Sequence, residues 1–147
     1  MKNKYLTVWI IPILLLGASC KKQEKLSQVE LAKKIQKTDL VGNWVPTKIE
    51  TLFIDKKNQK TSRVDSSDYV KFYTPAYKFT SDQVNEDHKS WDYSVVISDK
   101  SYILEYLKFG VLQHYEILKL NSDQLILKSI NKEESGIRTE VIYFKKN

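Results

Sequence analysis

Side chains that could carry out chemistry are sparse in this chain of 147 residues. The densest group is Asp82, Glu86, Asp87 and His88, whose carboxylates and imidazole are ligand types for Ca²⁺ or Zn²⁺. Their spacing matches no known metal-binding loop. We therefore interpret the group as a solvated loop between strands and expect no metal site.

Groups for covalent or acid–base catalysis are equally few. The chain has two histidines and one cysteine, and it contains no nucleophile elbow, no glycine-rich phosphate loop and no His-x-x-x-His pair. His114, between Gln113 and Tyr115, is expected to be half-buried and hydrogen-bonded rather than a base. A Ser-His-Asp arrangement assembled by the fold stays open as an alternative. We expect no catalytic residues, no cofactor and no enzymatic activity.

The single cysteine, Cys20, follows a segment with the three parts of a secretory signal. Lys2 and Lys4 precede an apolar run over residues 5–16, and small residues follow at 17–19. The apolar run is shorter than the roughly 20 residues that a membrane-spanning helix needs, although a transmembrane anchor is the alternative. With no partner in the chain, Cys20 cannot form an internal disulfide.

The sequence Leu16-Gly17-Ala18-Ser19-Cys20 resembles the lipobox of bacterial lipoproteins. The resemblance implies that residues 1–19 are removed and that Cys20 receives a diacylglycerol lipid and an acyl chain such as palmitate. Residues 20–26 would then be a lipidated tether, and residues 27–147 the folded domain. A free or intermolecular cysteine is the alternative. The implied location is the bacterial cell envelope, at the outer membrane, with the periplasmic or surface face left open.

The charge of the mature chain argues against a nucleic-acid partner. Removing residues 1–19 takes away Lys2 and Lys4 and no acid, which lowers the formal charge from +6 to +4. The excess is almost wholly lysine, whereas phosphate recognition favours clustered arginine with stacking aromatic residues. We expect the membrane, through the Cys20 lipid, to be one partner.

One short helix is expected before a chain of strands. Ser27 and Glu30 match a capping box, which predicts a helix over residues 28–37 that Thr38 and Asp39 interrupt. From Leu40 onward β-branched and aromatic residues dominate, and the patterns predict strands at about 43–54, 69–73, 76–80, 83–87, 90–97, 101–109, 111–120, 124–130 and 137–145.

The connections predict that neighbouring strands pair in sequence. Ser-Asp pairs recur in the links at 80–83, 97–100 and 121–124, as is typical of tight hairpin turns. Alternation at Trp91, Tyr93, Val95 and Ile97 indicates one buried face, whereas 101–109 and 111–120 are apolar on both sides. We therefore expect an all-β fold, a small antiparallel up-and-down barrel of about eight strands.

Residues 39–44, 77–82, 115–120 and 142–145 together resemble the lipocalin-like lipoproteins of Bacteroidetes-type bacteria. In that family a Gly-x-Trp segment, here Gly42-Asn43-Trp44, closes the barrel floor, and an arginine from the last strand covers the indole. The resemblance implies structural, barrel-closing roles for Trp44 and for Arg138. The chain lacks the Thr-Asp-Tyr loop of larger lipocalins.

Aromatic residues are the remaining candidates for a site, because tyrosine combines apolar area with one hydroxyl. Two functions follow. The first is a binding module for a small apolar or amphipathic ligand held at a barrel end. The second is an envelope interaction protein, an inhibitor or accessory subunit, that uses the outer surface over a packed interior. The candidate ligand-binding residues are Tyr77, Phe79, Trp91, Tyr93, Tyr102, Tyr106 and Tyr115.

Overall fold

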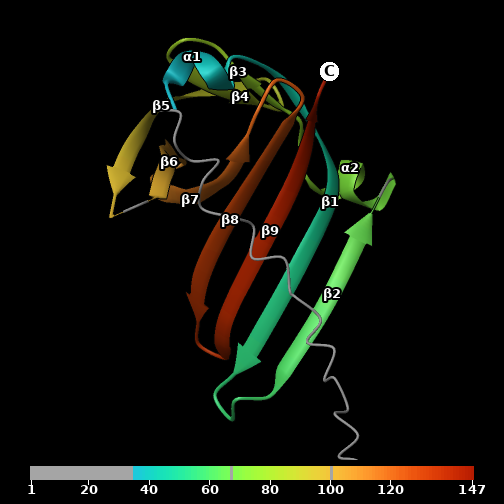
Figure 1. Cartoon of the computed structure of the whole chain (residues 1–147). Coiled ribbons are helices and arrows are strands. Elements are labelled where there is room, and N and C mark those ends of the chain that lie inside the picture. The colour runs from blue at the N-terminus through green and yellow to red at the C-terminus, as the bar shows by residue number, and fades with distance from the viewer. Residues whose placement is uncertain (1–34, 67, 100) are drawn as a thin grey trace, which may run out of the picture. The chain divides into compact units, whose positions relative to one another are not determined.

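The computed structural model describes residues 35–66, 68–99 and 101–147, which belong to one compact unit (Figure 1). The expected signal peptide, Cys20 with its tether, and most of the expected helix 28–37 lie outside the described residues. Two short helices are described, α1 (Lys37–Leu40) and α2 (Asp68–Tyr73). The strands are β1 (Gly42–Asp55), β2 (Lys60–Ser66), β3 (Tyr77–Phe79), β4 (Gln83–Glu86), β5 (Lys89–Ser98), β6 (Ser101–Lys108), β7 (Val111–Leu120), β8 (Gln124–Glu133) and β9 (Gly136–Lys146).

Eight strands close into an antiparallel barrel, as the sequence predicts. From β3 to β9 each strand pairs with the next, and β1 joins β9 to β3. β2 lies outside this ring and pairs with β1 alone among the described residues. The alternation of apolar and polar residues explains the closure, because a sheet with one apolar face buries it by curling on itself.

β1 pairs with three different strands along its length. Its first residues, Gly42–Trp44, pair with β3, and Lys48–Ile54 pair with β2, while β9 pairs with it along almost its whole length. The change of partner falls at Pro46, which has no N–H to donate, and the register with β9 shifts there. Prolines occur inside sheets at such bulges.

Beyond the barrel, four strands continue as a sheet that we call the extension. β7 pairs with β8 only as far as Lys128, so β8 from Ser129 onward is joined to β9 alone. β9, β1 and β2 complete this sheet in the order β8-β9-β1-β2 (Figure 1). The extension therefore ends in two open edges within the described part of the chain, at β8 and at β2.

Two predicted elements were wrong. The expected strand 69–73 is α2, in which Val70 is fully buried. Thr38 and Asp39, expected to interrupt a helix, lie inside α1, where the Asp39 carboxylate accepts a hydrogen bond of 2.9 Å from the Gln36 amide. Helices commonly begin where a side chain accepts hydrogen bonds from the first backbone N–H groups, which have no partner within the helix.

The predicted hairpin turns are confirmed, and in the turns at 80–83 and 121–124 the residue before the Ser-Asp pair makes the side-chain bonds. The Thr80 hydroxyl accepts from the Gln83 amide at 3.0 Å. The Asn121 side-chain oxygen accepts from the amides of Asp123 and Gln124 at 3.1 and 2.7 Å. Such side chains stabilise tight turns by replacing a backbone acceptor.

The interior is built from large side chains of every barrel strand. On β5 the predicted inner face holds Trp91, Tyr93 and Val95, but Ile97, at the end of the strand, is 62 % exposed. On β6 and β7, where the sequence left the inner face open, Tyr106 and Ile117 face the core. Further buried core residues are Leu40, Trp44, Tyr77, Phe79, Val84, Leu104, Leu125, Leu127, Ile142 and Phe144.

Candidate functional site

One end of the barrel is closed by Trp44 and α1. The Trp44 side chain is fully buried, and its indole N–H donates to the Leu40 carbonyl at 2.7 Å. Beside it, the Tyr93 hydroxyl donates to the carbonyls of Lys37 and Thr80 at 3.2 and 3.0 Å. Burial raises the pKa of Tyr93 to about 12. These contacts place Trp44 and Tyr93 in structural roles.

Arg138 does not cover Trp44, in contrast to the expectation from the lipocalin-like resemblance. In the β1–β9 register Arg138 faces Phe53, whereas Trp44 faces Lys146. The Lys146 ammonium lies 5.0 Å from the centre of the indole. Arg138 lies in the extension, where its guanidinium donates to Glu133 at 2.6 Å. The last strand therefore does supply a cation to Trp44, but this cation is Lys146 at the end of β9 and not Arg138 near its start.

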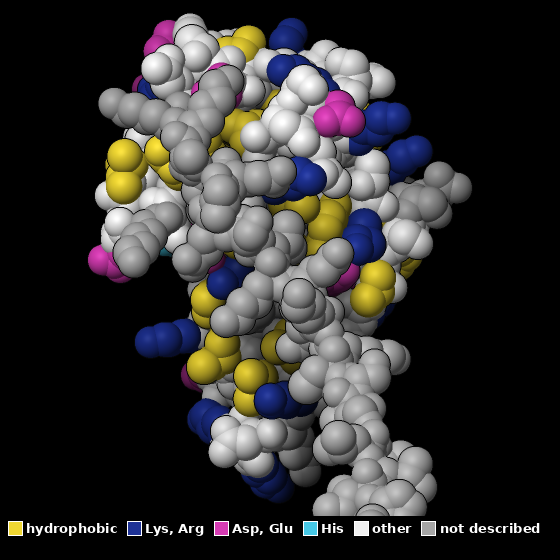
Figure 2. All heavy atoms as spheres, viewed as in Figure 1, with side chains coloured by type: hydrophobic (Ala, Val, Ile, Leu, Met, Phe, Trp, Pro, Cys, Tyr) yellow, Lys and Arg dark blue, Asp and Glu magenta, His cyan; other side chains and the backbone are white. Residues whose placement is uncertain are grey.

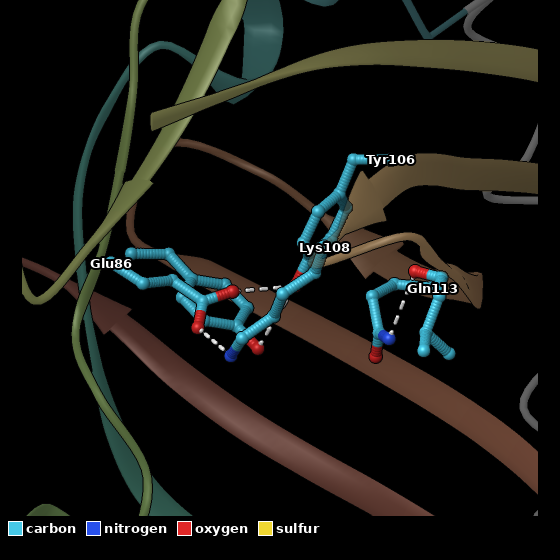
Figure 3. A network of polar contacts seen from close by, with 6 residues as sticks. Glu86, Tyr106, Lys108 and Gln113 are labelled. Carbon is cyan, nitrogen blue, oxygen red and sulfur yellow. Dashed lines mark hydrogen bonds and ion pairs between the residues drawn. The ribbon is translucent and has the colours of Figure 1, made fainter. Parts of the chain in front are cut away.

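A charged network occupies the barrel near the turns that follow β4 and β6 (Figure 3). Glu86 is 2 % exposed and accepts a hydrogen bond of 2.6 Å from the Tyr106 hydroxyl. Its other oxygen pairs with the Lys108 ammonium. The Tyr106 hydroxyl lies 3.4 Å from that of Tyr77, and the rings of Tyr106 and Tyr115 stack at 6.2 Å.

Burial dominates the electrostatics of these tyrosines. It raises the pKa of Tyr77, Tyr106 and Tyr115, and the nearby Glu86 carboxylate raises each of them further. Phenols that stay protonated donate hydrogen bonds and are not bases. The network therefore neutralises Glu86 rather than activating a nucleophile.

The seven predicted aromatic residues all belong to the interior, but they do not form one lining. Phe79 and Tyr93 pack together near α1, with ring centres 5.2 Å apart. Tyr77, Tyr106, Tyr115 and Trp91 gather around Glu86, and Tyr102 packs against the core. Every buried side-chain nitrogen and oxygen among the described residues has a hydrogen-bond partner. Tyr77, Phe79, Tyr93 and Tyr106 are each less than 5 % exposed, so these rings are packed inside the barrel.

The predicted loop cluster is split by the fold. Glu86 points inward, whereas Asp87 and His88 form the β4–β5 turn with φ angles of +44° and +68°. Asp82 lies in a different turn, between β3 and β4. No group of three metal-ligating side chains is found in the described residues. His114 is exposed and not half-buried as expected, but it is hydrogen-bonded as expected, through its ring to Glu105 at 2.9 Å.

Exposed apolar side chains gather at the end of the β6–β7 hairpin, on both of its faces, and we call them the hairpin patch. Its four members are 58 to 67 % exposed: Leu107, Phe109, Val111 and Leu112. The Phe109 ring contacts Trp91 edge-on at 5.5 Å, and the Lys89 ammonium lies 4.5 Å from its centre. The sequence indicated these exposed apolar residues only through the apolar character of both faces of residues 101–109 and 111–120.

The turn of this hairpin has an unfavourable residue in it. Phe109 and Gly110 have φ angles of +51° and +80°, as a type I′ turn requires. Asn or Gly usually occupies the first of these positions, because a bulky side chain at positive φ is strained. Phe109 is therefore unfavourable for the turn, and its own contacts with Trp91 and Lys89 leave most of the residue exposed.

Two open hollows lie on the outer face. One, of about 390 Å³, is lined by Ile103, His114, Glu116 and Lys128 among others. The Ser101 hydroxyl and the Lys128 ammonium hold the pKa of Glu116 below its ordinary value. The other, of about 330 Å³, includes Leu107 and Leu112 of the hairpin patch.

Comparisons with protein-family models, curated proteins and solved structures found no match for this chain. Within the described part of the chain, no helix has the length and apolar character needed to cross a membrane. The fold and the surface geometry are therefore the basis for a functional proposal.

Proposed function

We propose that this chain is a non-catalytic, lipid-anchored interaction protein of a bacterial cell envelope that binds a protein partner through the hairpin patch. The carrying observation is the exposure of Leu107, Phe109, Val111 and Leu112 on one hairpin, above a barrel filled with its own side chains. Exposed apolar groups that are contiguous mark interaction surfaces more often than isolated ones do.

The turn residue strengthens this interpretation. Phe109 is held in a conformation that costs an aromatic residue roughly 1–2 kcal/mol, yet the residue is 67 % exposed. Backbone strain of this kind is found most often at functional sites, so a strained and exposed Phe109 is a candidate for a binding contact. A buried aromatic anchor is the kind of residue that dominates protein interfaces.

Charge indicates the chemistry of the partner surface. Lys89 lies over the Phe109 ring, and Lys108, whose ammonium is neutralised by Glu86, adjoins the turn. A partner with an apolar pocket and an acidic rim would accept Phe109 and pair with Lys89. A ligand inside the barrel would instead have to displace core rings.

Anchoring rests on the lipobox-like sequence at residues 16–20. Replacing Cys20 by Ala should abolish labelling by a fatty-acid analogue and release the chain from the membrane fraction. Labelling that is unchanged in this variant would reject the lipid anchor without affecting the hairpin patch.

The partner can be sought by native mass spectrometry of the full chain purified from its own host. We expect a retained protein subunit that is lost when Phe109 is replaced by Asn, a residue suited to the turn. Ile97→Ser is the matched control, because Ile97 is as exposed as the hairpin patch but lies outside it. A retained small molecule that survives Phe109→Asn would favour the binding-module function instead.

A further inference from the structure

β2 leaves one edge of the extension open. Its seven residues pair with β1 on one side, and no other described strand pairs with it. Figure 1 shows β2 as the outermost strand of its sheet. The N–H and C=O groups on the far side of such a strand are ready to pair with another strand.

The side chains of β2 are sorted by face. Arg63 and Asp65 lie opposite Thr51 and Ile49, on the side that continues the barrel interior. Their side chains are 2.8 Å apart, with relative exposures of 59 % and 19 %. Val64 lies on the other side and is 64 % exposed. One face of the edge therefore carries one positive and one negative group, and the other carries an apolar residue.

We propose that β2 pairs antiparallel with β2 of a second copy of this chain, with Val64 opposite Val64 of the second copy. A two-fold axis perpendicular to a sheet keeps every side chain on its own face, so one residue must lie opposite the same residue of the second copy, with the axis midway between them. With Val64 on the axis, Arg63 lies opposite Asp65 of the second copy, and Asp65 opposite its Arg63.

Charge selects this register over its neighbours. An axis at Arg63 would place two arginines opposite each other, and an axis at Asp65 would place two carboxylates opposite each other. Like charges directly opposed across strands are destabilising, whereas opposite charges contribute. Charged edge strands normally resist pairing, but in this one register the charges of β2 complement themselves.

The pairing would also continue an apolar surface. Leu52 on β1 and Val64 on β2 face the same side of the extension, together with Ile130 and Ile137, all of them exposed. Figure 2 shows hydrophobic side chains between lysine and arginine side chains over the sheet of β8, β9 and β1. Two copies joined at β2 would form one sheet of eight strands with this surface running across it.

Disulfide trapping tests the axis. Directly opposed residues of antiparallel strands have Cα atoms about 4.5–5.5 Å apart, within the range a disulfide spans. We expect the full-length Val64→Cys chain, oxidised in its host membranes, to form a covalent dimer. Ile130→Cys is the matched control, because Ile130 is 58 % exposed on the opposite edge. The unsubstituted chain, with Cys20 as its single cysteine, controls for that thiol.

Charge exchange tests the register. In the Val64→Cys chain, Arg63→Asp or Asp65→Arg should each abolish the covalent dimer, because each opposes like charges. Expressing the two variants together should restore it as a heterodimer, which also shows that both fold. Lys57→Asp, in the exposed β1–β2 turn, makes the same charge change outside the strand and should leave the dimer intact.

Several outcomes would overturn the proposal. These are no dimer from Val64→Cys, an equal yield from Ile130→Cys, a cross-link to a chain of another mass, or no recovery when the two charge variants are mixed. Each of these results leaves the hairpin patch and its partner untouched, because β2 and the β6–β7 hairpin are separate surfaces.

Discussion

Glu86 is the residue whose removal is most informative about the interior. Its carboxylate is buried, accepts from Tyr106 and neutralises Lys108. We expect Glu86→Gln to lower the free energy of unfolding by about 1.5–3 kcal/mol, because Lys108 loses its counter-charge and Tyr106 its charged acceptor. Urea unfolding monitored by circular dichroism measures the change.

A matched control is the exposed pair of Glu105 and His114 on the outer face. Glu105→Gln should change the free energy of unfolding by less than about 1 kcal/mol, as is usual for exposed pairs. Equal losses in the two variants would mean that the Glu86 network contributes no more than a surface ion pair.

Trp44 is the site residue that the sequence predicted best. It is fully buried against α1, and we expect Trp44→Ala to cost about 3–5 kcal/mol of unfolding free energy. Thermal unfolding or urea titration gives the value, and a loss near zero would contradict the closed barrel end. The cation over Trp44 could not be predicted, because choosing between Arg138 and Lys146 requires the β1–β9 register.

At the scale of elements, Gly136 shows where the extension is most tightly joined. A Cβ at this position would lie 2.1 Å from the Ile54 carbonyl oxygen. We expect Gly136→Ala to cost about 1–3 kcal/mol by forcing β1 and β9 apart at the end of their pairing. Unfolding in urea measures the cost.

Gly110→Ala in the β6–β7 turn is the comparison, because a Cβ there meets nothing within 4 Å and strain arises only from its φ of +80°. We expect a cost of about 1 kcal/mol. If Gly136→Ala proved the milder change, β1 and β9 could not approach as closely as described.

Periodicity predicted most strands because one face of each is buried in the barrel. β2 was missed since its sequence, Lys60-Thr61-Ser62-Arg63-Val64-Asp65-Ser66, has one apolar residue and no buried face. The segment 69–73 was mistaken for a strand because tyrosine, valine and phenylalanine favour strands in general. In the fold this segment is helical, and Val70 of that helix is buried by tertiary contacts. The hairpin patch was visible only as an ambiguity, because exposure depends on which strands lie nearby.

For the whole molecule, the buried tyrosines predict instability in alkali. The pKa of each of Tyr77, Tyr106 and Tyr115 is raised by burial, so above about pH 10 the unfolded chain loses these protons while the folded chain keeps them. Stability is therefore fully present below that pH. It should fall as pH rises further, by up to about 1.4 kcal/mol per pH unit for each tyrosine.

Urea unfolding at increasing pH measures this slope, and phenolate absorbance reports the protons. Tyr106→Phe should reduce the dependence of the unfolding free energy on pH by the contribution of one tyrosine, up to about 1.4 kcal/mol per pH unit. Phenolate formation by all tyrosines of the folded chain near their ordinary pKa of about 10 would contradict the filled interior. Sequence alone could not separate a filled barrel from an open one, because the same aromatic residues serve both.

The pairing of β1 in the extension also predicts the order in which backbone amide protons exchange with solvent. Residues 48–54 of β1 have a strand on both sides, β2 and β9, whereas β8 beyond Ser129 and β2 each have one free side. Amide protons exchange with solvent when their hydrogen bonds open, and strands at an edge open before strands between two neighbours. In deuterated water, exchange should therefore advance from both margins of the extension toward its centre, so that β9 and residues 48–54 of β1 are the last to take up deuterium.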